Sequence, residues 1–265
     1  GTVTKAFMGT TQREVGAPYS IVAKALPGWI FAGWTGAMTG DNPTLAFRMV
    51  EGLTLTANFV PNPFPAHKGT YLGVISGDKP GLPKVVVTAN GVLSGKVTFG
   101  GKTHAVKGRL NANGEATVTI SRKSLQPLVL SLDLDLTGGS GQIAATLTEG
   151  DVEHSIVATH STGVDMTNLA GRYTVVFPGL AESTSGVPAG NGAAVLLISK
   201  KGVAKIAGWL ADGTPLTLTT RVTKSLEVPV YRGLYTNGGS VAGVLQLRDT
   251  SVSDVDGAMQ WSRPE

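Results

Sequence analysis

The segment PGWIFAGWTGAMTGDNPTLAFRMVEGLTLTANF, from Pro27 to Phe59, indicates the fold class of this chain. Three aromatic residues, Trp29, Phe31 and Trp34, fall within six positions and are followed by a glycine-rich stretch. The segment ends in the run 53–59, where apolar residues alternate with Thr and Asn. Side chains of a strand point alternately to its two faces, so this run predicts a β-strand with one face in a core.

The same segment resembles the internalin-type B-repeat, a small extracellular bacterial module. The resemblance is carried by an aromatic-x-aromatic-x-Gly-Trp-x-Gly block, then Asn-Pro, then Thr-x-x-Ala-x-Phe. These positions are Trp29, Phe31, Gly33, Trp34, Gly36, Asn42, Pro43, Thr54, Ala57 and Phe59. The resemblance covers about the first quarter of the chain and implies a β-grasp-like module in a secreted or surface-displayed protein. It names no ligand.

The composition fits a protein made of many short strands. Among 265 residues there are 36 glycines and 14 prolines, while only 15% of residues are charged and 42% are hydrophobic. Turn-forming residues, few charges and ample core material favour an all-β fold and argue against disorder. The length allows one large β domain or two to three smaller ones.

Charge and cysteine content exclude several functional classes. The net charge is +4, but the basic residues are scattered and no run exceeds Lys200–Lys201, so we expect no nucleic-acid binding. No cysteine is present, which excludes disulfides, thiolate metal sites and a cysteine nucleophile. The apolar runs are far shorter than the roughly 20 residues of a membrane-spanning helix. No signal peptide is recognisable, and we expect the chain to be a fragment flanked by further domains.

A proline-rich stretch, VPNPFPAHK at 60–68, predicts the clearest domain boundary. Alternating prolines favour an extended path, so residues 61–68 are expected to be a semi-rigid linker after a module at 1–60. Strand-like runs separated by Asn-Gly and Gly-Gly turns then continue to the C-terminal end. The runs expected as strands up to residue 159 are Tyr71–Ile75, Lys84–Thr88, Val92–Phe99, His104–Leu110, Glu115–Ser121, Pro127–Leu136, Gln142–Leu147 and His154–Thr159.

A weak internal repeat divides residues 69–265 into halves at 69–165 and 166–265. Three correspondences suggest it: 69–71 with 171–173, 90–95 with 201–208, and 137–143 with 237–241. Each half is expected to supply five or six strands, too few for a closed barrel, so the halves are predicted to form one antiparallel barrel or sandwich.

Both halves also resemble a repeat of large, secreted, multidomain bacterial proteins of unassigned function. The segments that carry this resemblance are 69–73, 132–139, 170–174, 210–214, 228–235 and Trp261-x-x-Pro264. The resemblance implies no catalytic signature. B-repeats are frequent neighbours of such repeats, which agrees with the order of segments here.

No motif in the sequence indicates catalysis, a cofactor or a metal centre. The four histidines, at 67, 104, 154 and 160, are not paired at spacings that direct two imidazoles to one metal. Ser140 belongs to a Gly-Gly-Ser-Gly turn, and Gly190-Asn-Gly192 precedes a strand-like run and not a helix. We therefore expect a non-enzymatic protein without cofactors.

Two acidic segments are weaker candidates for cation binding. Asp133 and Asp135 are two positions apart in a predicted strand, so their carboxylates are expected on one face. A solvated strand face explains them more simply. The loop 249–257 offers oxygen ligands but matches no defined calcium loop, so an ordinary polar hairpin is favoured.

Aromatic residues are the only candidate ligand contacts. Trp29, Trp209, Tyr231 and Tyr235 could stack on sugar rings, although core packing explains most such residues. The leading prediction is a non-enzymatic extracellular or cell-surface module for adhesion, display or spacing, with an unidentified glycan or protein partner. The alternatives are a carbohydrate-binding accessory module and a lipocalin-like small-ligand barrel. An intramolecular Lys–Asn crosslink also stays open.

Overall fold

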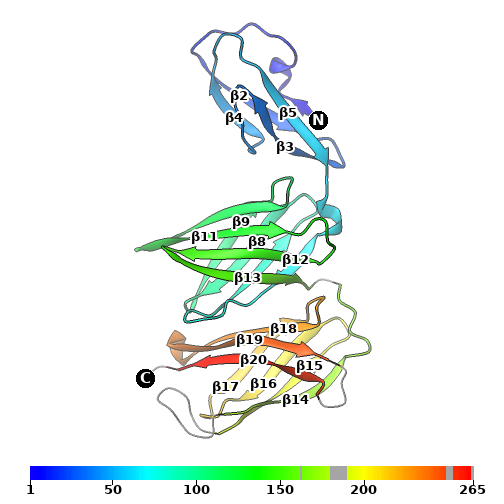
Figure 1. The fold of residues 1–265 in the computed structure, drawn as a ribbon, viewed down its shortest axis with the longest axis vertical. Helices are drawn as coiled ribbons and strands as arrows, with labels where there is room; N and C mark the ends of the chain where they lie inside the picture. Colours follow the sequence, from blue (N-terminus) through cyan, green and yellow to red (C-terminus); the bar gives the residue numbers. More distant parts are fainter. Residues whose placement is uncertain (162, 180–189, 249–252, 264–265) are drawn as a thin grey trace.

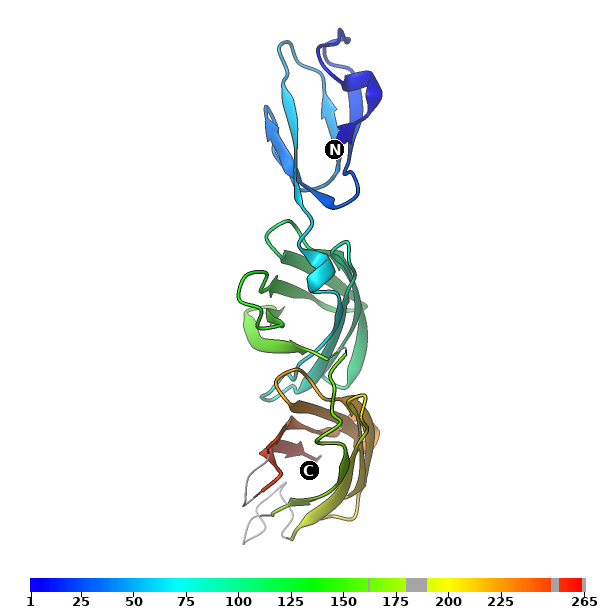
Figure 2. The ribbon, with the colours of Figure 1, turned by 90° about the vertical axis from the view of Figure 1, so that its right-hand side faces the viewer.

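The computed structural model confirms an all-β protein, with three β units placed one after another along its longest axis (Figures 1 and 2). It describes residues 1–161, 163–179, 190–248 and 253–263. Each unit has its own hydrophobic cluster, and no cluster draws buried residues from two units. Helical structure in the described residues is limited to three short 3₁₀ turns, η1 (Lys5–Phe7), η2 (Phe64–Ala66) and η3 (Tyr235–Asn237).

The N-terminal unit packs two small antiparallel sheets against each other. One sheet has the order β1-β2-β4, and the other pairs β3 with β5. Its strands are β1 (Thr2–Val3), β2 (Pro18–Lys24), β3 (Trp29–Gly36), β4 (Thr44–Arg48) and β5 (Leu55–Pro61). The predicted alternation in the run 53–59 is confirmed, since its apolar side chains pack against the core of this unit.

Trp34 is the centre of this small core. Its side chain is only 2% exposed, and its indole Nε1 donates a hydrogen bond to the backbone oxygen of Asn42 at 3.0 Å. Gly36 lets the neighbouring strand approach closely, because a Cβ there would lie 2.4 Å from the backbone oxygen of Thr54. Trp34 and Phe31 of the aromatic-glycine block therefore belong to this core, whereas Trp29 is exposed.

The second unit is a nearly closed eight-stranded antiparallel barrel with strand order β10-β11-β12-β13-β6-β7-β8-β9. The two end strands, β9 and β10, are consecutive in the chain and meet at the turn 110–114. The strands are β6 (Gly69–Leu72), β7 (Gly81–Val87), β8 (Val92–Phe99), β9 (Lys102–Arg109), β10 (Glu115–Arg122), β11 (Leu125–Leu134), β12 (Gln142–Glu149) and β13 (Val152–His160).

Large side chains fill the interior of this barrel. The fully buried ones include Tyr71, Leu93, Leu128, Leu130, Ile143 and Leu147. Phe64, from η2, joins the same cluster and is 1% exposed. Burial raises the pKa of Tyr71 to about 12, and its hydroxyl donates a hydrogen bond to the backbone oxygen of His67 at 2.7 Å.

The third unit has seven described strands in two sheets, with orders β14-β15-β16-β17 and β18-β19-β20. The sheets share one hydrophobic cluster, which includes the buried Met166. The strands are β14 (Gly171–Phe177), β15 (Gly192–Ile198), β16 (Val203–Trp209), β17 (Pro215–Arg221), β18 (Glu227–Leu234), β19 (Gly239–Leu247) and β20 (Val255–Ser262).

Equivalent hydrogen bonds show that the second and third units are copies of the same structural repeat. The hydroxyl of Tyr173 donates to the backbone oxygen of Leu169 at 2.6 Å, as Tyr71 does to His67. Buried Phe64 and Met166 lie three residues before these acceptors. A Cβ on Gly91 would meet the Phe64 ring, and a Cβ on Gly202 would meet Met166. The strands β6–β12 therefore correspond in order to β14–β20.

The expectation of one barrel shared by both halves is wrong. Every strand pairing among the described residues stays within one half, and each half has a separate core. The first half supplies eight strands, one for each of the eight runs named from the sequence, and the second supplies seven described ones, so the expectation of five or six strands per half was too low. Eight strands are enough to close a sheet around its own side chains.

One of the three proposed repeat correspondences is also wrong. Residues 137–140 form the turn between β11 and β12, whereas 237–240 form the turn between β18 and β19, one hairpin earlier in the repeat. The match reflected two Gly-Gly turns of similar composition. The correspondence at 69–71 agrees with the structure, and so does that of 90–92 with 201–203. Gly95 and Gly208 do not correspond, because strand register places Gly95 where β16 has Ile206.

The proline-rich segment is a fixed junction and not an extended spacer. β5 continues to Pro61, and η2 then inserts Phe64 into the barrel. Asn62 connects both sides, because its amide N–H donates to the oxygen of Gly28 and its side-chain Nδ2 donates to the oxygen of Ala89, each at 2.9 Å. Phe64 plugs the barrel end because an apolar ring in the connection is more stable buried.

The second and third units are also hydrogen-bonded to each other. The backbone N–H of Lys224 donates to the oxygen of His160 at 2.7 Å, and Arg221 Nε donates to the oxygen of Ser161 at 3.3 Å. A third hydrogen bond between the two units involves β20, where the side-chain oxygen of Gln260 accepts from the backbone N–H of Gly77 at 3.3 Å. The connection between the barrels is therefore held by contacts on both sides.

Candidate functional site

The outer face of the β14–β17 sheet carries an exposed row of apolar residues. Strand pairing aligns Val176, Ala193, Trp209 and Pro215 across the four strands. All four are exposed, and the Trp209 side chain is the most open large apolar side chain described, at 66%. The row, called here the Trp209 row, forms because consecutive strands place paired residues side by side on one face.

Polar and basic side chains flank the Trp209 row. The next outward-facing positions contain Thr174 and Thr217, followed by Arg172, Lys205 and Thr219. Leu197 lies between the two basic residues and is 49% exposed. The same sheet face therefore presents an exposed indole together with hydroxyl and cationic groups, which offer stacking and hydrogen bonding.

Tyr235 lies in a strained turn between β18 and β19. Tyr235, Thr236 and Asn237 have φ values of 51°, 55° and 70°, so three consecutive non-glycine residues are left-handed. Such a run costs conformational energy and persists only where surrounding contacts hold it.

The hydroxyl of Tyr235 is the centre of those contacts. It donates to Asp212 Oδ2 at 2.6 Å, and it accepts from Trp261 Nε1 at 3.2 Å and Thr214 Oγ1 at 3.4 Å. Burial, followed by the Asp212 contact, raises the pKa of this phenol. The arrangement ties the β16–β17 hairpin to β18 and β20, so the Tyr235 ring belongs to the scaffold and not to an open platform.

Tyr231 and Trp29 lie at the two junctions between units. Tyr231 is half-buried, and burial raises its pKa, an effect partly offset by a hydrogen bond from the backbone of Gly101 in the neighbouring barrel. Trp29 is 46% exposed and lines an open cleft of about 1270 Å³ between the N-terminal unit and the first barrel. Arg109 and Asp41 line the same cleft. The four candidate aromatic residues are therefore not brought together.

Asp133 and Asp135 do not both lie in a strand, as the sequence had suggested. Asp133 lies in β11 and lines a shallow hollow on the outer face of β10–β13. Asp135 follows the strand and caps the next turn, where its carboxylate accepts hydrogen bonds from the backbone N–H of Gly138 at 2.6 Å and the Ser140 hydroxyl at 2.5 Å. These bonds hold the pKa of Asp135 well below its usual range.

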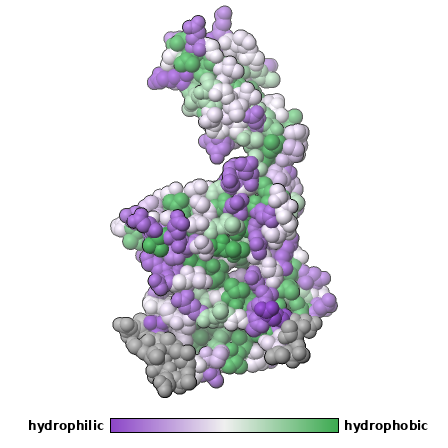
Figure 3. All heavy atoms as spheres, in the orientation of Figure 1, coloured by the Kyte–Doolittle hydropathy of each residue, from purple (hydrophilic) through white to green (hydrophobic). Residues whose placement is uncertain are grey.

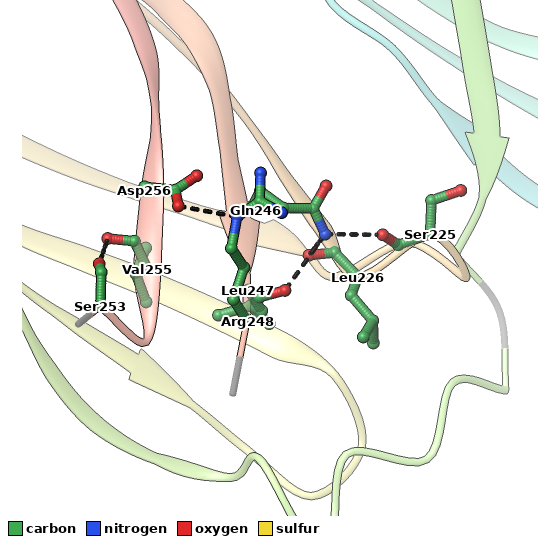
Figure 4. A network of polar contacts seen from close by, with 8 residues as sticks. All are labelled: Ser225, Leu226, Gln246, Leu247, Arg248, Ser253, Val255 and Asp256. Atoms are coloured by element: carbon green, nitrogen blue, oxygen red, sulfur yellow. Dashed lines mark hydrogen bonds and ion pairs between the residues drawn. The ribbon is translucent and has the colours of Figure 1, made fainter. Parts of the chain in front are cut away.

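The acidic loop at 249–257 lies partly outside the described residues. Its described end is occupied by protein contacts: Arg248 Nε donates to Asp256 Oδ2 at 2.7 Å (Figure 4). Beside this pair, Gln246 Nε2 donates to three backbone oxygens, those of Ser225, Leu226 and Leu247 (Figure 4). The Gln246 amide thereby holds Leu226, whose φ is 59°.

The histidines lie in separate places. His160 is buried beside Tyr71, with ring centroids 5.0 Å apart, and burial lowers its pKa. His154 stacks edge-on against Phe99 at 5.0 Å. Within the described part of the chain, no group of three His, Asp or Glu side chains is close enough to hold a metal. None of the described helices is long and apolar enough to cross a membrane.

Sequence reasoning missed the residues that hold Tyr235. Asp212 and Trp261 both belong to segments that carry the repeat resemblance, so their positions were noticed without a role. Their partnership could not be predicted because 26 positions separate Tyr235 from Trp261. The Trp209 row could have been found by aligning outward positions of four predicted strands.

Comparison with known proteins gives no similarity on which to base a family assignment. No family model matches the chain, and neither a curated protein nor a solved structure matches it. A function for this chain must therefore be argued from its own geometry.

Proposed function

We propose that this chain is a non-enzymatic, extracellular segment of a larger surface-displayed or secreted bacterial protein, in which it provides spacing and display. The observation that carries the proposal is the row of three separately cored β units with hydrogen-bonded junctions. Asn62 fixes the first junction, and Lys224 and Arg221 contribute to the second. A row of this kind keeps its ends apart.

Two resemblances seen in the sequence support the proposal. The N-terminal unit resembles a B-repeat, and the two barrels resemble repeats of secreted multidomain proteins. Both are in keeping with an extracellular location, with further domains flanking this segment. The buried Trp34 and the close approach at Gly36 are the features that such a module would need.

A replacement experiment in the full-length protein tests the spacing role. Residues 1–265 are exchanged either for a flexible Gly/Ser linker with the same number of residues or for an unrelated rigid β rod of the same length. Surface display of a distal epitope, measured by antibody binding to intact cells, should fall with the flexible linker and recover with the rod. Equal display with both replacements would contradict a spacing role.

A second candidate, carbohydrate binding, is favoured by the Trp209 row. An exposed indole, with Thr174, Thr217 and Lys205 on the same sheet face, suits stacking against a sugar ring. Affinity electrophoresis in gels containing polysaccharides should show retardation that Trp209→Ala removes. Leu125→Ala is the control, because Leu125 is also exposed but lies in the first barrel and is not a candidate ligand contact. No retardation in any gel would count against this candidate.

The filled barrel interior gives no support to a lipocalin-like role. Side chains including Leu130, Ile143 and Leu147 occupy the centre of the first barrel with no measurable exposure. We therefore do not carry this alternative further.

A further inference from the structure

Among its described residues, the third unit has no strand equivalent to β13 of the first barrel. In the first barrel, β13 lies between β12 and β6 and runs antiparallel to both. The equivalents of β12 and β6 are β20 and β14, but no described strand pairs with the outer edge of either. One strand at this position would join the two sheets into a single order, β18-β19-β20, new strand, β14-β15-β16-β17.

Burial along β20 shows the effect of the gap. Strand register places Val255 where the first barrel has Ile143, and Met259 where it has Leu147. Ile143 and Leu147 are 0% exposed, whereas Val255 and Met259 are only partly buried. The difference follows from β13, which covers the first pair with Ile156 and Ala158.

The gap also leaves apolar surface open to solvent. Val255, Met259 and Trp261 all pack against the core of the third unit while staying partly exposed. Figure 3 shows hydrophobic residues at the surface of this unit, and Figure 1 shows β20 and β14 on that same side. Partly covered core residues beside an unpaired strand edge are the features that recruit an added strand.

We propose that the gap between β20 and β14 is an acceptor site for one further β-strand, the equivalent of β13. This inference rests on the larger protein proposed above, whose chain supplies the strand directly after β20, because β13 follows β12 directly in the first barrel. The occupant runs antiparallel to β20 and has apolar residues at alternate positions, like β13. It buries a medium-sized apolar side chain opposite Gly257 and a small one opposite Val255, because Ile156 and Ala158 occupy the equivalent places. Backbone hydrogen bonds to both neighbours supply much of the binding.

Hydrogen exchange on a chain that carries its own strand tests the proposal. A copy of Gly150–His160 is placed directly after Trp261 in place of residues 262–265, because Trp261 stands where Glu149 precedes the β12–β13 turn. The control carries the same copy with Asp at the positions that correspond to Ile156 and Ala158. Exchange in segments 171–177 and 255–262 should slow at least about tenfold relative to the control. Equal exchange in the two chains would overturn the proposal.

A second measurement decides the matter if the added copy disturbs folding, which would appear as lost protection throughout 171–262. The unaltered chain is then titrated with a synthetic peptide of Val152–His160 and with the same peptide carrying Asp at the two apolar positions. Saturable protection of the same two segments by the first peptide alone supports the acceptor site. No protection by either peptide overturns it.

Discussion

A single buried side chain anchors the connection ahead of each barrel. Phe64 enters the first core from η2, and Met166 enters the second core from the segment between the barrels. Both are almost fully buried, and both lie beside a left-handed glycine, Gly91 or Gly202. Because each side chain belongs to a connecting segment, its burial fixes the neighbouring unit as well as its own barrel.

Trp34→Ala should unfold the N-terminal unit alone. The substitution removes a side chain that is 2% exposed and a hydrogen bond to Asn42, at an expected cost of about 3–5 kcal/mol. In a core with only four buried residues, that loss exceeds what the remaining contacts can offset. Calorimetry should show the transition of this unit lost and those of the barrels retained. Loss of all transitions together would show that the units are not independent.

The stability of the first barrel should fall as the pH drops below about 6.5. Burial lowers the pKa of His160 in the folded protein, so the unfolded chain takes up this proton at a higher pH than the folded chain. The stabilisation is therefore present above the unfolded pKa and is lost on acidification. His104 has a lowered pKa as well, owing to burial and then to Arg122 and Lys102.

Urea unfolding between pH 7.5 and 5.5 separates the two histidines. His160→Gln should reduce the slope of the unfolding free energy against pH. The matched variant His104→Gln should reduce that slope by less, because His104 is less buried. An unchanged slope in His160→Gln would contradict the assignment.

At the scale of elements, the two repeats differ in the turn that precedes their third strand, which is β8 in the first and β16 in the second. Gly91 and Gly202 have nearly equal φ values, 72° and 71°, but a Cβ would lie 2.5 Å from the Phe64 ring and 3.6 Å from Met166. Gly202→Ala should cost about 1–2 kcal/mol from backbone strain alone. Gly91→Ala should cost about 1–3 kcal/mol more, because the rigid ring must move.

Chemical denaturation of each single variant measures this difference. The two substitutions serve as controls for each other, since backbone conformation and the added methyl group are the same. Equal losses of stability would show that the packing of Phe64 against Gly91 does not contribute to the stability of the first barrel.

Strands and hairpins could be predicted from the sequence because their signals are local. The expected strands between Tyr71 and Thr159 all occur, with ends shifted by a few residues. The assembly of the halves could not be predicted, because strand pairing depends on contacts between distant residues. The role of Phe64 was hidden for a similar reason, since a proline-rich segment indicates an extended path but not what its one aromatic residue packs against.

The candidate site was only partly foreseen. Trp209 was predicted as a possible ligand contact and is highly exposed, whereas Tyr235 is held by Asp212, Trp261 and Thr214. An aromatic residue in a strand-like run gives the same sequence signal in both situations. What separates them is the identity of the neighbours on adjacent strands, which lie far away in the chain.

At the scale of the whole molecule, each unit has its own hydrophobic core. The first barrel is the most complete case, with eight strands, a filled interior and no buried cluster shared with its neighbours. Its contacts to the third unit include hydrogen bonds of His160 and Ser161.

Thermal unfolding of residues 62–161 expressed alone tests this claim most directly. We expect this fragment to be a soluble monomer with dispersed amide signals and one cooperative transition, because Phe64 and all eight strands are retained. Phe64→Ala in the same fragment should lower its stability by about 3–5 kcal/mol. An insoluble fragment, or one without a cooperative transition, would contradict separate cores and would show that the two halves fold only together.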